Sequence, residues 1–198
     1  MSSLYLHIPF CTQRCVYCDF YFVTTQKSHG SFVDAMCAEI EYYAKEYSEP
    51  VESIYFGGGT PSLLRIDELA RLLTTIEKNF DVSLVRETTL EMNPEAAELD
   101  YLQALRSLGI NRLSLGVQSF FPSDLEFMNR SHTAEQAEAS IELVKKAGFD
   151  NFSVDLIFGI PGQPEEYWFA NVQKMIRLGA PHISTYNLTV EERTPLHK

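Results

Sequence analysis

The chain has 198 residues, with 16 Lys and Arg against 27 Asp and Glu, and its formal net charge is −11 at pH 7. This acidity argues against a surface built for nucleic-acid backbones, because phosphate binding needs a cationic face. No apolar run approaches the roughly 18 residues of a membrane span, and the first residues lack the basic and apolar regions of a signal peptide. We therefore expect one cytoplasmic domain over residues 1–198.

Short β-rich runs alternate with helical patterns along the chain. The predicted strands are Leu4–Ile8, Ser53–Phe56, Thr88–Met92, Arg112–Val117, Ser153–Phe158 and His182–Leu188. The predicted helices are Ser31–Tyr47, Asp67–Asn79, Leu99–Leu108, Ala134–Ala147 and Glu165–Leu178. Three of these helices are followed by a glycine, at Gly109, Gly148 and Gly179, as is typical of helix ends. The alternation predicts a parallel α/β fold.

Both an open doubly wound sheet and a (β/α) barrel fit this alternation. Polar or glycine-rich sequence stands at the end of each of the first five predicted strands or just after it, at residues 11–18, 57–61, 91–94, 118–120 and 159–162. An open sheet concentrates its site at one switch point, whereas a barrel builds its site from many strand ends. We therefore predict a partial (β/α)6 TIM-like barrel, a parallel sheet with outer helices. A full barrel needs about 250 residues, so we expect the front part of a longer protein.

Three of the four cysteines, Cys11, Cys15 and Cys18, stand in the spacing C-x3-C-x2-C. In a reducing compartment such a group binds metal or performs redox chemistry more often than it forms disulfides. Structural zinc usually takes four ligands in two pairs, and the sequence offers no second pair. Three thiolates in one loop suit a [4Fe–4S] cluster whose open iron can bind a small ligand. Cys37 stands apart on the apolar face of a predicted helix, and we interpret it as a core thiol.

This cysteine motif, placed after a first strand, resembles that of the radical S-adenosylmethionine (SAM) superfamily. Further sequence segments resemble the oxygen-independent coproporphyrinogen III oxidase family, in order and over essentially the whole chain. They are YLHIPFC at 5–11, GGGTP at 57–61, LGVQSF at 115–120 and DLIFGIPGQ at 155–163. The resemblance implies a [4Fe–4S] cluster and SAM as cofactors. In that family an electron from the cluster cleaves the sulfonium C–S bond of SAM to give a 5′-deoxyadenosyl radical.

Two branches of this family differ beside the third cysteine. The oxidases carry an N-terminal extension and a further Cys two residues after the third ligand, whereas this chain has its first strand at Leu4 and Phe20 at that position. Both departures resemble the HemW-type haem-chaperone branch. That branch implies haem as cargo, a haem-accepting protein and a reductant such as flavodoxin or ferredoxin.

Two other functions remain as alternatives at this point, so whether the chain is an enzyme stays open. The first is an oxidase that decarboxylates the propionates of a porphyrinogen. The second is a radical SAM enzyme acting on RNA or a peptide, which the acidic charge and the lack of an appended RNA-binding module disfavour.

The resemblance also carries family roles onto single residues. Cys11, Cys15 and Cys18 match the cluster ligands, and His7 matches a position that supports their loop. The residues that match SAM contacts are Tyr5, Tyr17, Gly58, Gly59, Thr60, Glu91, Gln118, Arg130 and Asp155. Simple packing is the alternative for the two tyrosines, and a surface position is the alternative for Arg130.

Overall fold

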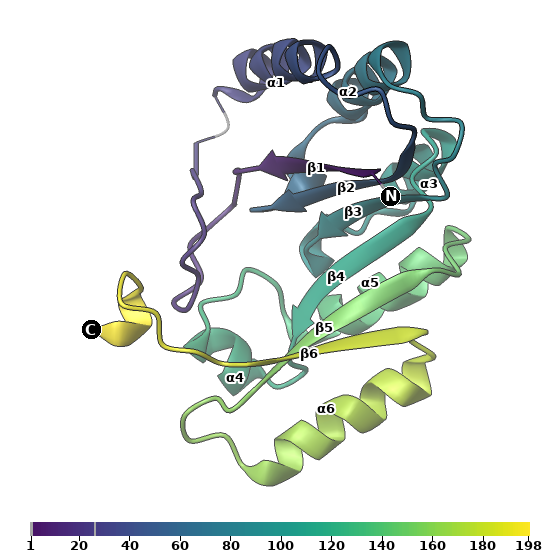
Figure 1. Ribbon diagram of the computed structural model, residues 1–198. Helices are drawn as coiled ribbons and strands as arrows, with labels where there is room; N and C mark the ends of the chain where they lie inside the picture. The colour runs from purple at the N-terminus through teal and green to yellow at the C-terminus, as the bar shows by residue number, and fades with distance from the viewer. Residues whose placement is uncertain (1, 26) are drawn as a thin grey trace.

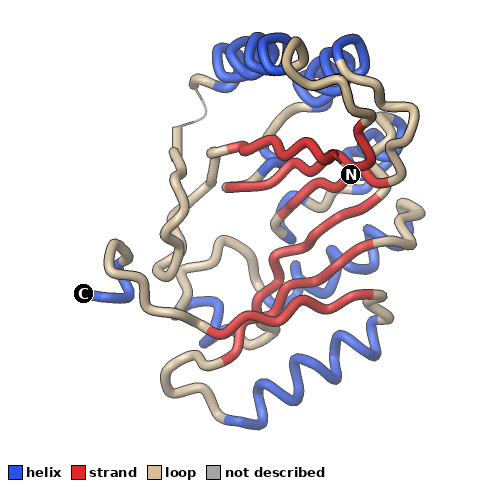
Figure 2. The backbone as a smooth tube through the Cα atoms, viewed as in Figure 1, coloured by secondary structure: helices blue, strands red, loops and turns tan. Residues whose placement is uncertain are grey.

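The computed structural model describes residues 2–25 and 27–198. Six parallel strands form one curved sheet, with helices along its outer face (Figures 1 and 2). The strands are β1 Ser2–Ile8, β2 Val51–Gly58, β3 Glu87–Met92, β4 Arg112–Gln118, β5 Phe152–Phe158 and β6 His182–Asn187. The helices are α1 His29–Tyr43, α2 Ile66–Asn79, α3 Leu99–Ser107, α4 Pro122–Phe127, α5 Ala134–Lys146 and α6 Glu165–Leu178. Short 3-10 turns are η1 Pro61–Leu63, η2 Pro94–Ala96 and η3 Pro195–His197.

The strand order decides between the two predicted architectures. The strands lie in the sheet in their sequence order, β1 to β6, and every neighbouring pair is parallel. A doubly wound sheet would reverse its order at a switch point, and this sheet does not. The prediction of a partial (β/α)6 barrel is therefore confirmed.

The apolar core lies between the sheet and the outer helices. On β1, Leu6 and Ile8 are buried against this layer, whereas Tyr5 and His7 are more exposed and alternate with them. On α2, Leu69 and Leu72 are fully buried in the same core. Burying such side chains contributes about 1.5–3 kcal/mol each, so this layer holds the strands in register. The other face of the sheet is left for polar residues.

The predicted elements are confirmed with small differences. Helix α1 ends at Tyr43 instead of Tyr47, and Gly109, Gly148 and Gly179 have positive φ, as expected for residues that follow a helix. Helix α4 was not predicted, because six residues are too few to show a hydrophobic period. Its first residue, Pro122, could have indicated a helix start, because proline is common at the first position of a helix. Among the described residues, no helix has the length and apolar character to span a membrane.

Candidate functional site

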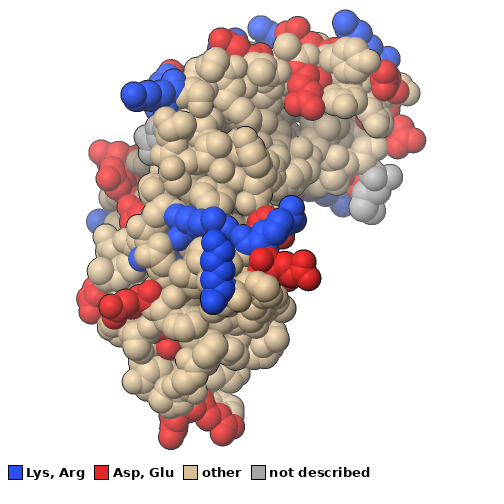
Figure 3. All heavy atoms as spheres, turned by 90° about the vertical axis from the view of Figure 1, so that its left-hand side faces the viewer, with Lys and Arg blue, Asp and Glu red and all other residues tan. Residues whose placement is uncertain are grey.

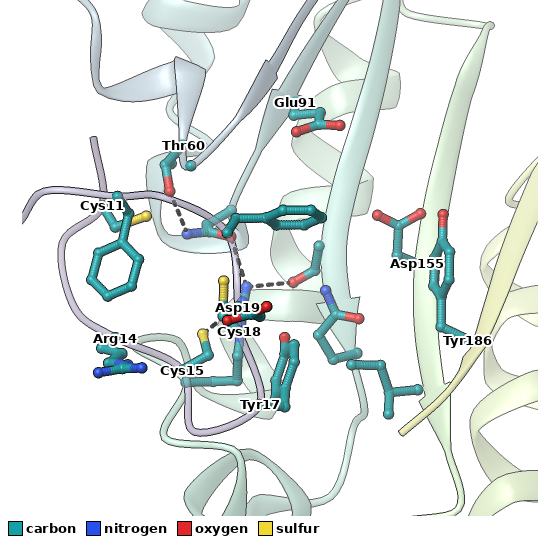
Figure 4. Close-up of a pocket in the computed structure, with 18 of the residues that line it drawn as sticks. Cys11, Arg14, Cys15, Tyr17, Cys18, Asp19, Thr60, Glu91, Asp155 and Tyr186 are labelled. Atoms are coloured by element: carbon teal, nitrogen blue, oxygen red, sulfur yellow. Dashed lines mark hydrogen bonds between the residues drawn. The ribbon is translucent and has the colours of Figure 1, made fainter. Parts of the chain in front are cut away.

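A cavity of about 620 Å³ opens on the concave face of the sheet, where the strands end. Its walls come from the cysteine loop, the glycine turn after β2, the ends of β3, β4 and β5, and the segment after β6. Figure 4 shows the cysteine sulfur atoms, Glu91 and Asp155 around this one space. All three clustered cysteines line the cavity. The predicted SAM contacts that also line it are Tyr17, Gly58, Gly59, Thr60, Glu91, Gln118, Arg130 and Asp155.

Tyr5 is the predicted SAM contact that does not line this cavity. Its side chain is 59% exposed and stacks on Tyr55, with 6.0 Å between the ring centroids. Its hydroxyl hydrogen-bonds His7 Nδ1 at 3.1 Å, and His7 Nε2 lies 3.5 Å from the Tyr21 carbonyl oxygen of the cysteine loop. Tyr5 therefore supports His7, and His7 contacts the loop. A direct contact of Tyr5 with SAM stays a prediction.

The three thiols share the cavity and influence one another. Burial raises the pKa of the Cys11 and Cys18 thiols, and neighbouring cysteines of the trio add to this rise. Cys15 Sγ accepts a hydrogen bond from Arg130 Nη1 at 3.3 Å. Across residues 2–25 and 27–198, no three His, Cys, Asp or Glu side chains are gathered as a site for a single metal ion. The assignment of the thiols as cluster ligands therefore rests on their spacing and shared cavity.

The cysteine loop is fastened to the turn that precedes Arg130. Gln13 Nε2 donates to the Asn129 carbonyl oxygen at 2.8 Å, and Asn129 Nδ2 donates to the Arg14 carbonyl oxygen at 2.7 Å. Asn129 has φ of 53°, a left-handed conformation that Asn tolerates better than most residues. This pair of side-chain bonds fixes the loop relative to Arg130.

The glycine turn after β2 packs directly on the cysteine loop. A Cβ added at Gly59 would lie 2.6 Å from the Phe10 carbonyl oxygen and 2.9 Å from Cys11 Sγ. The neighbouring Gly58 has φ of 112°, which favours glycine, and its N–H donates to Glu91 Oε2 at 3.1 Å. The glycines thus allow a close backbone approach between this turn and the cysteine loop.

Glu91 is held at the edge of the cavity by two donors. Its Oε1 accepts the Tyr55 hydroxyl at 2.7 Å, and its Oε2 accepts the Gly58 N–H. Burial raises the pKa of the Glu91 carboxyl, while these hydrogen bonds oppose the rise. The carboxylate is therefore fixed in position where it can accept a donor from a ligand in the cavity.

Arg130 is part of the cavity wall, and its alternative reading as a surface residue is wrong. Its Nη2 donates to Asn93 Oδ1 at 2.6 Å and to the Gly116 carbonyl oxygen at 2.8 Å, while Asn93 Nδ2 donates to Thr60 Oγ1 at 3.3 Å. These contacts form a chain from Thr60 to Cys15 (Figure 4). Arg130 Nε is shielded from solvent and has no hydrogen-bond partner among the described residues. Such a buried donor favours an acceptor ligand.

Asn93 and Asn171 are important residues that the sequence analysis missed. Asn171 of α6 is fully buried, accepts the Phe120 N–H at 2.8 Å and donates to Ser119 Oγ at 3.0 Å. These bonds hold the turn beside Gln118, whose φ of 67° is a strained conformation for a non-glycine residue. The position of Asn93, two residues after Glu91 at a strand end, was a signal that could have found it. No sequence pattern near Asn171 indicates its role, because its hydrogen-bond partners are about 50 residues away in the chain.

Asp155 lies on β5 and faces the cavity. Burial raises the pKa of its carboxyl to about 6; a hydrogen bond with Ser184 opposes the rise, and the nearby Glu91 carboxylate adds to it. On the same face, Ser153 Oγ donates a hydrogen bond to Ser114 Oγ at 3.0 Å. Asp155 therefore keeps a proton at a pH where an exposed carboxyl has lost it.

This shift predicts a pH dependence of stability. An unfolded Asp titrates near pH ~3.9, so between about pH 4 and 6 the folded chain binds more protons than the unfolded chain. The free energy of unfolding should fall as the pH rises through this window, and Asp155→Asn should flatten that fall. Carboxyl NMR of the cofactor-free chain should give a midpoint near pH 6 for Asp155; a midpoint near ~4 would contradict the assignment.

A parallel partial barrel with three loop cysteines beside a glycine turn defines a class of protein. The sequence matches the Radical SAM superfamily over residues 5–175, and the chain belongs to this superfamily. Membership implies a [4Fe–4S] cluster and SAM as cofactors.

The proteins that this chain resembles include haem chaperones and a coproporphyrinogen III oxidase. The chain is 39% identical to the haem chaperone HemW of Lactococcus lactis, over 98% of this chain and 50% of that protein. It is 35% identical to HemW of Synechocystis, over 100% of this chain and 49% of that protein. The solved structure of the coproporphyrinogen III oxidase HemN of Escherichia coli matches with a TM-score of 0.89 and 31% identity, over 98% of this chain and 46% of that chain. The chain thus spans about half the length of the relatives it matches.

Proposed function

We propose that the chain is the radical SAM core of a HemW-type haem chaperone, which binds haem and transfers it to a haem-accepting protein in the cytoplasm. Residues 1–198 form this core, and a further domain completes the protein. The 39% identity to HemW over nearly the whole chain carries the proposal. Phe20 supports it, because the oxidase branch has a cysteine at that position. A reductant such as flavodoxin or ferredoxin supplies the electron.

The residues of the cavity fit the two implied cofactors. Cys11, Cys15 and Cys18 would hold the cluster, and Arg130 Nε would donate to the carboxylate of SAM. Glu91 would accept a hydrogen bond from the amino group of SAM, and Asp155 would contact the nucleoside hydroxyls. When bound, the two groups supply one-electron cleavage of the sulfonium bond.

The chain's own residues fix the walls of the site in which these groups would bind. The chain of contacts through Thr60, Asn93 and Arg130 fixes the guanidinium before a ligand enters. The buried Asn171 holds the turn that follows Gln118. A site fixed in this way loses little free energy to reorganisation when it binds its ligand.

The alternative function is the oxidative decarboxylation of coproporphyrinogen III, which the TM-score of 0.89 to HemN favours. The two functions separate in one experiment. Anaerobically reconstituted chain is incubated with coproporphyrinogen III, SAM and dithionite, and separately titrated with haem. We expect stable haem binding and no protoporphyrinogen. Formation of protoporphyrinogen by the chain, and not by its Cys15→Ala variant, would overturn the chaperone proposal in favour of the oxidase.

A further inference from the structure

The mouth of the cavity carries aromatic side chains that the cofactors do not account for. Phe20 lines the cavity and yet is 70% exposed, and Phe22, two residues further on, also lines it and is half-buried. Large exposed aromatic rings beside a cavity are typical of binding surfaces, because each offers flat apolar area. Both rings belong to the loop that carries Cys11, Cys15 and Cys18.

Positive charge lies beside these rings. The guanidinium carbon of Arg14 stands 5.7 Å from the centroid of the Phe22 ring, and Arg14 Nη2 donates to the Arg193 carbonyl oxygen at 2.9 Å. Figure 3 shows basic side chains gathered in the middle of this face, with carboxylates near them. Arg193 pairs with Asp19 at 3.0 Å, whereas Arg14 forms no ion pair within the part of the chain that the structure describes. In a chain of net charge −11, Arg14 is therefore a local cation free to bind an anion.

The size of the cavity places a large ligand at its mouth. A volume of about 620 Å³ is typical of a pocket for one small ligand, and the implied cluster and SAM take that space. A tetrapyrrole macrocycle does not fit beside them inside the cavity. Such a ligand has to lie across the opening, where Phe20, Phe22 and Arg14 are.

We propose that Phe20, Phe22 and Arg14 form a platform for the planar, carboxylate-bearing tetrapyrrole that the protein handles. The two rings contact the macrocycle, and the guanidinium of Arg14 pairs with a propionate carboxylate through parallel hydrogen bonds. Arg193 flanks the same edge. This inference rests on the proposed haem function and deepens it, because it assigns the cargo to the cysteine-loop face of this chain.

The test uses metal-free protoporphyrin IX, because it has no iron to which a cysteine thiolate could bind. Its fluorescence is followed during titration with the reconstituted chain. Phe20→Ala should raise the Kd about tenfold, since one aromatic face is lost. Arg14→Ala should raise it about fivefold, as expected for one exposed charge-assisted contact. Matched controls lie elsewhere on the surface. Tyr47 is 62% exposed and Arg177 is exposed on α6, and Tyr47→Ala and Arg177→Ala should change the Kd by less than about twofold.

A second ligand isolates the carboxylate contact. The dimethyl ester of protoporphyrin IX keeps the flat ring and lacks the anionic propionates. Arg14→Ala should therefore weaken the binding of the acid and leave the binding of the ester unchanged, whereas Phe20→Ala should weaken both. All titrations are repeated on the cluster-free chain, so that a variant with poor cluster loading still gives a result.

The outcomes separate the platform from the proposed function. If the wild-type chain binds haem and both variants bind protoporphyrin IX as the wild type does, the platform is wrong and the chaperone function stands. An equal effect of Arg14→Ala on the acid and the ester would show that Arg14 acts on the fold of the loop, and would also overturn the platform. If the wild-type chain binds neither haem nor protoporphyrin IX, the proposed function fails together with the platform.

Discussion

The Cys15→Ala variant is expected to lose the iron–sulfur cluster. Cys15 is the middle cysteine of C-x3-C-x2-C, and its sulfur lines the cavity and contacts Arg130. The two remaining thiolates cannot hold a cluster that needs three protein ligands and keeps one iron open. After anaerobic reconstitution, the wild-type chain should be brown with broad absorbance near the visible–ultraviolet boundary, and the variant should be colourless and bind no iron.

Cys37 provides the matched control for this experiment. It is 7% exposed in the apolar core and lies outside the cavity, where it accepts a hydrogen bond from Thr75 Oγ1 at 3.4 Å. Cys37→Ala should keep the full iron content and lose only some thermal stability. The cluster assignment would be wrong if the wild-type chain bound Zn²⁺ tightly and failed to take up iron.

Gly59→Ala is the second substitution with a large expected effect. The new Cβ would lie 2.6 Å from the Phe10 carbonyl oxygen and 3.0 Å from that of Ile8. Both oxygens belong to backbone, and the Ile8 oxygen accepts the Gly59 N–H at 2.8 Å, so the glycine turn and the cysteine loop would have to separate. We expect a loss of about 1–3 kcal/mol in the free energy of unfolding, together with poor cluster loading.

Gly30→Ala should change the stability in the opposite direction. Gly30 lies in α1, and a Cβ added there meets nothing within 4 Å. Alanine should therefore stabilise the chain by about 0.5–1 kcal/mol through its helix propensity. Urea unfolding of the cofactor-free variants measures both effects. Equal stability of the Gly59→Ala variant and the wild type would refute the packing argument.

Much of the candidate site could be predicted because it is encoded locally. The spacing of Cys11, Cys15 and Cys18 is a short-range pattern, and the polar or glycine-rich residues at the ends of the first five strands are neighbours of those strands in sequence. The predicted SAM contacts therefore meet in one cavity, Tyr5 excepted. Tyr5 was predicted to contact SAM only because its sequence motif resembles that of the family. Alternation along β1 puts it on the concave face, but only the structure shows that its ring stacks on Tyr55 outside the cavity wall.

The sequence by itself determined the α/β class, the approximate strands and helices, and the close spacing of Cys11, Cys15 and Cys18, since each depends on residues close together in the chain. The tertiary structure confirmed that the strands run in order as a partial barrel, and it alone showed that Arg130 is a half-buried link between Asn93 and Cys15. It also placed Arg193 beside Arg14 at the cavity mouth. These features depend on contacts between segments that are distant in sequence, and such contacts form only when the sheet has brought the segments together.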